Sequence, residues 1–96
     1  MKIIWLESAR EQLEEILEYI SQDSQVNAHK YTAELFARTN NLLQFPDIGT
    51  IYSWKGQKVV RRLVIDKTKF ILYKIEKKND HLLILSIKDT RTDWKQ

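Results

Sequence analysis

The stretch that decides the fold is KVVRRLVIDKTKFILYKIEKKNDHLLILSIK, residues 58–88. It contains three runs rich in β-branched, aromatic and other apolar residues, separated by two short polar segments. Such runs favour strands, and polar connections of four or five residues are short enough for hairpins. The stretch therefore predicts an antiparallel meander of three strands, at residues 58–65, 70–76 and 82–88.

The segment before this meander predicts two helices, the first of which begins at Ser8. Ser8 and Glu11 have the Ser-x-x-Glu spacing of a capping box, in which the hydroxyl and the carboxylate satisfy two backbone N–H groups left unpaired at a helix start. Beyond this start, apolar residues recur at helical spacing, at Ala9, Leu13, Ile16, Leu17 and Ile20. Glutamates lie on the opposite side, so this helix is amphipathic.

A second helical stripe follows a polar break at residues 23–24. It consists of Val26, Ala28, Tyr31, Leu35, Thr39 and Leu42. Pro46 cannot continue a helix and disfavours helical geometry at the preceding residue, so we expect this helix to end near Leu43 or Gln44. Because the connection between the two helices is short, they should form an antiparallel hairpin.

The flanking segments complete the predicted fold. Residues 2–6 (KIIWL) are β-prone and predict one more strand, whereas residues 47–57 contain both glycines of the chain and predict an ordered loop. The order is β-α-α-β-β-β, an α+β domain with a helical hairpin packed on one face of a mainly antiparallel sheet. A chain of 96 residues has room for one hydrophobic core, so residues 1–96 should form a single domain.

Side-chain alternation along the meander predicts two unlike sheet faces. One face is apolar throughout and consists of Ile71, Tyr73, Ile75, Leu83, Leu85 and Ile87. The other face is mixed, apolar at one end and charged at the other. We expect the helices to cover the first face and a ligand or partner chain to use the second.

Composition excludes several kinds of site. The chain has no cysteine, so it has no disulfide, thiol nucleophile or thiolate metal site, and His29 and His81 cannot form a zinc centre alone. We therefore expect no metal and no cofactor. The apolar runs are far shorter than the roughly 20 residues that cross a bilayer, and the N-terminus lacks the apolar segment of a signal peptide. We expect a cytoplasmic protein with no membrane partner.

The formal net charge of +3 hides a division between the two halves of the chain. Residues 1–54 contain four Lys or Arg and eight Asp or Glu, a net charge of −4, whereas residues 55–96 contain twelve and five, a net charge of +7. This asymmetry predicts that the second half builds a surface for a polyanion or an acidic partner.

Basic residues of the second half are the candidate binding residues: Arg61, Arg62, Lys69, Lys74, Lys88 and Arg91. Neighbouring residues of a strand point to opposite faces, so at most one of Arg61 and Arg62 can enter a given site. Two interpretations remain. Either these side chains reach solvent or pair with helix glutamates, or they form a basic sheet face that receives phosphates or an acidic protein surface.

Aromatic residues near these cations could stack on a nucleic-acid base, but Tyr73 belongs to the apolar face, which favours a core role. Trp94, among polar residues near the C-terminus, fits either packing or binding. The sequence has no glycine-rich phosphate loop, HExxH or nucleophile elbow. Conventional enzyme chemistry therefore has little support. If the chain cleaves RNA, Arg and Lys must stabilise the developing charge.

Five segments in this order resemble the RelE/ParE superfamily of toxins from type II toxin–antitoxin systems. They are AREQLEEILEYI (9–20), FPDIG (45–49), VRRL (60–63), ILYKI (71–75) and ILSIKDTR (84–91). The resemblance covers nearly the whole chain. It implies the β-α-α-β-β-β fold predicted above, and a cognate antitoxin whose extended or helical segment wraps the toxin in a hetero-oligomer.

The resemblance also implies site residues and two targets. Arg61 matches the Arg of the family's R-x-L strand, Tyr73 the Tyr of its central strand, and Arg91 the Arg that closes its last strand. RelE-like members cut mRNA in the ribosome, whereas ParE-like members inhibit DNA gyrase. The long helical hairpin and the F-P-x-x-G turn look more ParE-like. Many relatives carry a His where this chain has Asp89, which disfavours ribonuclease chemistry.

The predicted function is therefore a ParE-like, growth-inhibiting toxin that binds DNA gyrase and is neutralised by an antitoxin. One alternative is a ribosome-dependent mRNA endonuclease in which Arg61 and Arg91 stabilise charge. Another is a non-toxic binding module of the same fold. In each case the expected target- or partner-binding residues are Arg61, Arg62, Lys69, Lys74, Lys88, Arg91 and Trp94.

Overall fold

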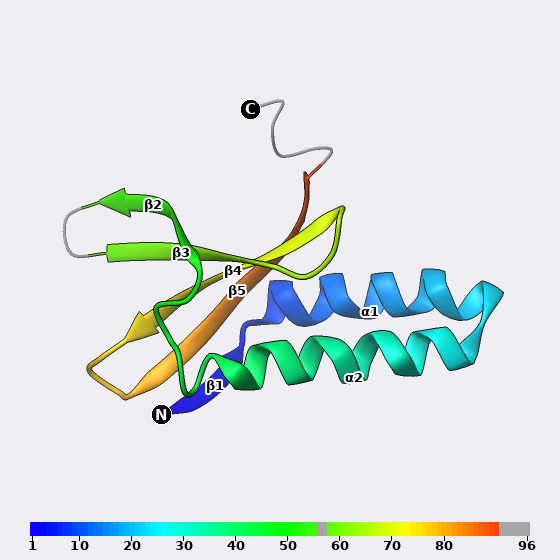
Figure 1. Cartoon of the computed structure of the whole chain (residues 1–96), viewed down its shortest axis with the longest axis horizontal. Coiled ribbons are helices and arrows are strands. Elements are labelled where there is room, and N and C mark those ends of the chain that lie inside the picture. Colours follow the sequence, from blue (N-terminus) through cyan, green and yellow to red (C-terminus); the bar gives the residue numbers. More distant parts are fainter. Residues whose placement is uncertain (56–57, 91–96) are drawn as a thin grey trace.

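The structure is a computed structural model that describes residues 1–55 and 58–90. Its elements, in chain order, are β1 (Lys2–Trp5), α1 (Glu7–Asp23), α2 (Gln25–Asn41), β2 (Thr50–Lys55), β3 (Lys58–Val64), β4 (Lys69–Glu76) and β5 (His81–Asp89). The two helices run antiparallel beside one sheet, and their far ends extend beyond it (Figure 1). The α+β class and the helical hairpin are confirmed. Neither helix is long and apolar enough to span a membrane.

The sheet has five strands in the order β1-β5-β4-β3-β2. β1 lies parallel to β5, and the remaining neighbours are antiparallel. The predicted meander is confirmed, but the prediction that residues 47–57 form only a loop is wrong. Thr50–Lys55 pairs with β3 as an edge strand, with a register shift between Ile51 and Ser53. The residues between the two glycines are β-prone, and this preference favours a strand despite the glycines on either side.

Helix α1 does not use the predicted capping box. It begins at Glu7 with Leu6 at the N-cap and no side-chain cap. Ser8 instead donates its hydroxyl to the Leu85 carbonyl at 2.8 Å, and Gln12 accepts a hydrogen bond from the Ile87 amide at 2.7 Å. These residues dock α1 onto β5. The Leu6 amide still bonds to the Ile84 carbonyl at 3.0 Å, so the strand leads directly into the helix.

Helix α2 begins where the polar break was predicted. Its N-cap is Ser24, whose hydroxyl accepts from the Asn27 amide at 3.1 Å. The helix ends at Asn41, and residues 42–44 continue as turns rather than as helix. At the other end of the predicted stripe, Val26 does not join the core, because it lies at the tip of the hairpin and is 64% exposed.

The core lies between the hairpin and the sheet. Its buried cluster consists of Ala9, Leu13, Leu35, Leu42, Ile65, Ile71, Tyr73, Leu82, Ile84 and Ile87. The register passes from Leu72↔Ser86 to Tyr73↔Ile84, so β5 has one extra residue at Leu85. This bulge shifts the alternation of β5. The prediction that Leu83 and Leu85 line the core face is therefore wrong, and Leu82 and Ile84 do so instead.

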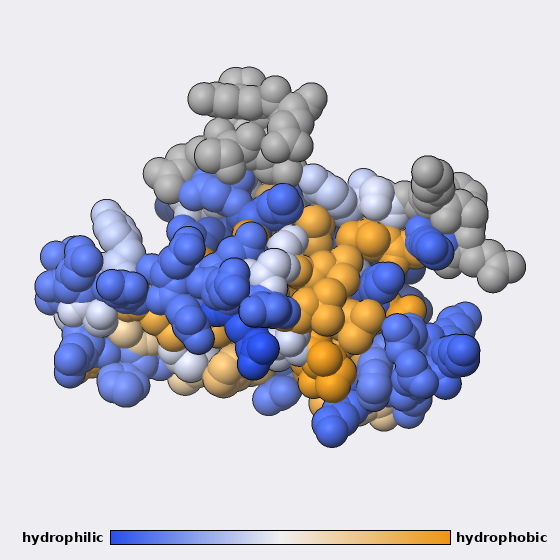
Figure 2. Space-filling view, turned by 180° about the vertical axis from the view of Figure 1, so that it is seen from behind, coloured by the Kyte–Doolittle hydropathy of each residue, from blue (hydrophilic) through white to orange (hydrophobic). Residues whose placement is uncertain are grey.

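The second sheet face is also partly apolar. Cross-strand partners share a face, so the register places Ile4, Leu72 and Leu83 on the side away from the core. Figure 2, which views the molecule from behind, shows a hydrophobic patch bordered by hydrophilic side chains. We call Ile4, Leu72 and Leu83 the sheet patch. The mixed character predicted for this face is confirmed.

Candidate functional site

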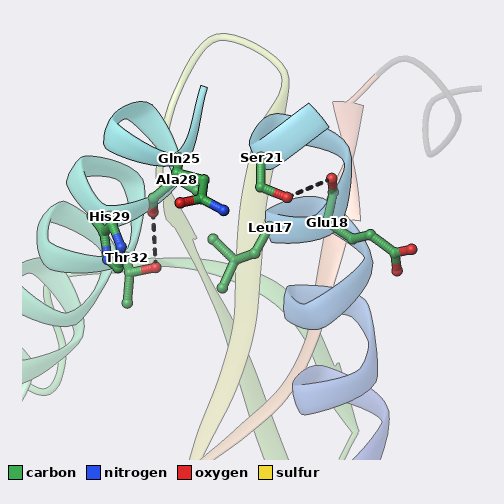
Figure 3. Close-up of a pocket in the computed structure, with 7 residues that line it drawn as sticks. All are labelled: Leu17, Glu18, Ser21, Gln25, Ala28, His29 and Thr32. Carbon is green, nitrogen blue, oxygen red and sulfur yellow. Dashed lines mark hydrogen bonds between the residues drawn. The ribbon is translucent and has the colours of Figure 1, made fainter. Parts of the chain in front are cut away.

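A wide hollow of about 490 Å³ lies between the two helices (Figure 3). Its two hydroxyl groups are already used within their own helices. Ser21 donates to the Glu18 carbonyl at 2.9 Å, and Thr32 donates to the Ala28 carbonyl at 3.0 Å. These hydroxyl groups follow the helix backbone rather than converge on a common point. The hollow therefore has the character of a gap between helices, not of a catalytic site.

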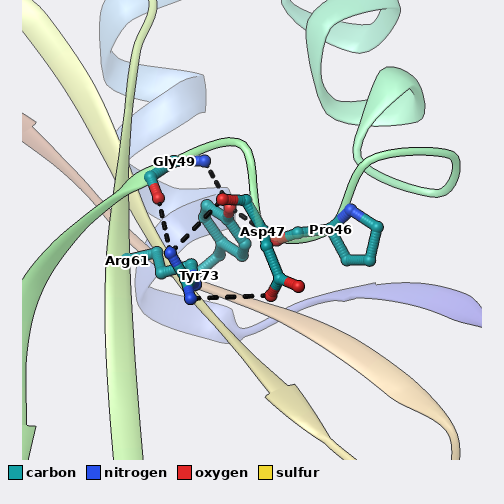
Figure 4. Close-up of polar contacts among 5 residues, drawn as sticks. All are labelled: Pro46, Asp47, Gly49, Arg61 and Tyr73. Carbon is teal, nitrogen blue, oxygen red and sulfur yellow. Dashed lines mark hydrogen bonds and ion pairs between the residues drawn. The ribbon is translucent and has the colours of Figure 1, made fainter.

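Polar groups converge instead where the chain leaves α2 and enters β2 (Figure 4). The Tyr73 hydroxyl donates to the Pro46 carbonyl at 2.7 Å and accepts from the Gly49 amide at 3.0 Å. Arg61 Nη1 donates to the carbonyls of Gly49 at 2.8 Å and of Asp47 at 3.3 Å. Arg61 Nη2 also lies 3.6 Å from the Asp47 carboxylate. Two strands thus hold one turn, residues 45–49, which we call the anchored turn.

Gly49 is the position where the anchored turn passes closest to the sheet. A Cβ atom there would lie 2.7 Å from the Arg62 carbonyl oxygen and 2.7 Å from the Tyr73 hydroxyl. Real Cβ atoms do not approach other atoms so closely, so any other residue would push the turn away from Tyr73. The close approach of Gly49 explains why the turn ends in glycine.

Burial dominates the electrostatics of Tyr73. Its side chain has no exposed surface, and this burial raises the pKa of the phenol. The Gly49 amide and the Arg61 charge lower the pKa but do not cancel the effect of burial. The phenol is thus protonated near neutral pH and acts as a hydrogen-bonding group rather than as a base.

A cavity of about 230 Å³ opens beside this network. It is lined by Asp47, Val59, Arg61, Tyr73, Lys74, Ile75 and Lys77. Two lysines and one arginine face a single carboxylate, so the cavity is basic. No group of three or more metal-ligating side chains occurs within residues 1–55 and 58–90.

The structure separates the predicted cations into two sets. Arg61 pairs with Tyr73 across β3 and β4 and lies on the core side, 23% exposed. Lys69 is also on that side, in a hollow with residues of both helices, and donates to the Thr68 hydroxyl at 3.3 Å. Arg62 lies on the opposite face with its guanidinium 5.2 Å from the centre of the Phe70 ring. Lys88 pairs with Phe70 and shares that face.

Arg61 is not free to meet an external ligand as the sequence suggested, because its guanidinium holds the anchored turn. The core role expected for Tyr73 is confirmed. Arg91 and Trp94 lie outside the described residues. The sequence reasoning did not include Pro46, Asp47 and Gly49 among the site residues, although the proline and glycine in FPDIG signal a constrained turn.

The fold can be compared with that of a solved structure. The "Chromosomal ParDE TA system from P. aeruginosa" matches with a TM-score of 0.72 and 20% sequence identity, over 93% of this chain and 95% of that chain. At 20% sequence identity, this match shows that the two chains share a fold. No curated protein sequence matches the chain.

The family follows from the sequence itself. Residues 3–94 match the family described as the ParE toxin of type II toxin-antitoxin system, parDE. Because the match spans nearly the whole chain, this protein belongs to the ParE toxin family. It is the toxin component of a type II toxin–antitoxin system, and its partner is a cognate antitoxin.

Proposed function

We propose that this toxin inhibits DNA gyrase by binding it and does not cut nucleic acid. The observation that carries the proposal is that Arg61 and Tyr73 are both engaged within the fold. The guanidinium and the phenol together hold the anchored turn through contacts with Pro46, Asp47 and Gly49. Side chains committed in this way support a surface for binding rather than a reaction centre.

The same contacts weaken the ribonuclease alternative. A general base must lose its proton near the working pH, and burial raises the pKa of Tyr73 above its usual value of 10.0. Charge stabilisation needs donors directed at the reacting phosphate, whereas Arg61 directs Nη1 at two backbone carbonyls. A gyrase inhibitor needs neither group to react.

We infer that the antitoxin covers the sheet patch. Ile4 and Leu83 are partly exposed on this face, where Leu72 is buried, and Arg62 and Lys88 lie on the same face. An amphipathic antitoxin segment with apolar and acidic residues matches this combination. Since gyrase acts on chromosomal and plasmid DNA, we place the protein in the cytoplasm.

The test is to induce the chain alone and with its antitoxin, and to assay purified toxin on gyrase supercoiling. The proposal expects growth arrest that the antitoxin relieves, inhibition of supercoiling and gyrase-dependent DNA breaks. Mapping of mRNA 5′ ends in the same cells addresses the alternative. New ends within codons, without inhibition of gyrase, would instead establish an mRNA endonuclease. Normal growth beside a working control toxin would favour a non-toxic binding module.

A further inference from the structure

The anchored turn and the residue pair before it display large apolar side chains to solvent. Leu43 is 42% exposed, Phe45 55% and Ile48 54%. Phe45 and Ile48 flank a shallow hollow formed by residues 44–48. Single exposed apolar residues are ordinary, but three within six residues of one connection form a concentrated surface.

The backbone beneath these side chains is fixed. The Phe45 amide bonds to the Asn41 carbonyl at 3.1 Å, and the Ile48 amide to the Phe45 carbonyl at 3.2 Å. The contacts of Tyr73 and Arg61 hold residues 46, 47 and 49 from the sheet side. The backbone that carries Phe45 and Ile48 is therefore held in place before any partner arrives. A preformed surface loses little conformational entropy on binding.

We propose that Phe45 and Ile48 are the apolar anchors through which this toxin binds gyrase, an inference that rests on the proposed function. The matching surface on the enzyme is an apolar socket with carboxylates at its rim, since Lys74 and Lys77 line the neighbouring cavity. Projecting side chains of this kind fit a preformed socket on a folded protein. An extended antitoxin segment is better suited to the sheet patch.

The experiment measures gyrase binding, inhibition of supercoiling and antitoxin binding for Phe45→Ser, Ile48→Ser and the double variant. Val26→Ser is the matched control, because Val26 is also apolar and is 64% exposed at the far end of the hairpin. Each single change should weaken gyrase binding at least about tenfold, as expected for an anchor residue. The control should keep both activities, and all variants should keep antitoxin binding.

Phe45→Leu guards against a loss caused by unfolding. It keeps an apolar side chain on the turn and should retain more gyrase binding than Phe45→Ser at the same thermal stability. If wild-type toxin inhibits gyrase and the serine variants inhibit it equally well, this inference fails while the proposed function stands. Loss of antitoxin binding alone would assign the turn to the antitoxin and overturn the inference. A wild-type chain that does not bind gyrase overturns both.

Discussion

Tyr73 and Tyr31 both lie at the interface between the helices and the sheet, yet they use their hydroxyl groups differently. The Tyr73 hydroxyl makes two hydrogen bonds to the anchored turn. The Tyr31 hydroxyl oxygen is buried without a hydrogen-bond partner among the described residues. The Asp66 carboxylate is near enough to raise the pKa of Tyr31, but no hydrogen bond of full geometry joins the two side chains.

This difference teaches where polar contacts contribute to the structure. At the end of α2, a tyrosine, an arginine and a glycine fix the path of one turn. Toward the tip of the hairpin, Tyr31 contributes mainly its ring, in a hollow of apolar character with Ile16 and Ile20. The turn should therefore be sensitive to single changes, whereas the Tyr31 hydroxyl should be dispensable.

Gly49→Ala should have the largest effect on stability. The added Cβ would meet the Arg62 carbonyl and the Tyr73 hydroxyl, each at 2.7 Å, so the turn must shift and lose its bonds to Tyr73. We expect a loss of about 3 kcal/mol of unfolding free energy. Urea denaturation would measure it, with exposed Ser53→Ala of β2 as the control. Wild-type stability in Gly49→Ala would show that the turn is not tightly held.

Tyr73→Phe should have the second largest effect on stability. It keeps the buried ring but leaves the Gly49 amide and the Pro46 carbonyl without their partner. Leaving such groups unsatisfied costs about 2 kcal/mol in unfolding free energy. Hydrogen exchange of the Gly49 amide should also become faster. An unchanged exchange rate would mean that Tyr73 does not protect this amide.

The sequence predicted some features of this fold and missed others. Hydrophobic periodicity located both helices and the meander, because the 3.6-residue and two-residue periods are local signals. The β5 bulge at Leu85 was not foreseen, since it depends on the pairing with β4. Nor did the capping spacing of Ser8 reveal that its hydroxyl would bond to Leu85 instead. In both cases tertiary contacts override a local pattern.

The candidate site was predictable only in part. The cationic strand and FPDIG were both visible in the sequence, and Tyr73 was correctly expected in the core. The contacts of Arg61 with Asp47 and Gly49 could not be predicted, because they join residues at least 12 positions apart. Only the pairing of β2 with β3 brings them together.

Arg61→Ala and Arg62→Ala form a matched pair on adjacent residues of β3. Arg61→Ala removes the hydrogen bonds to the turn, which should lower the unfolding free energy by about 1.5 kcal/mol. Arg62 is exposed and loses its contact with the Phe70 ring, which should cost about 0.5 kcal/mol. Arg61→Ala should also weaken gyrase binding, as a residue that positions Phe45 and Ile48. Equal effects in both variants would contradict the distinct role of Arg61.

Tyr31→Phe should have the smallest effect at neutral pH, within about 0.5 kcal/mol of wild type, because the hydroxyl makes no hydrogen bond in the described structure. Alkaline pH should separate the two proteins. Burial and then the Asp66 charge raise the pKa of Tyr31 from 10.0 to about 12. A pKa raised in the folded state means that the folded chain holds this proton more tightly than the unfolded chain.

The stability linked to this proton is complete below pH 10 and is lost as the pH rises from 10 toward 12. The unfolding free energy, measured in urea, should therefore fall between pH 8 and pH 11. The fall should be larger for wild type than for Tyr31→Phe. Tyr73 also has a raised pKa, but it is present in both proteins and contributes equally to both slopes. Parallel pH dependence would show that the Tyr31 proton is not linked to folding. A large loss at pH 8 would show that its hydroxyl is paired after all.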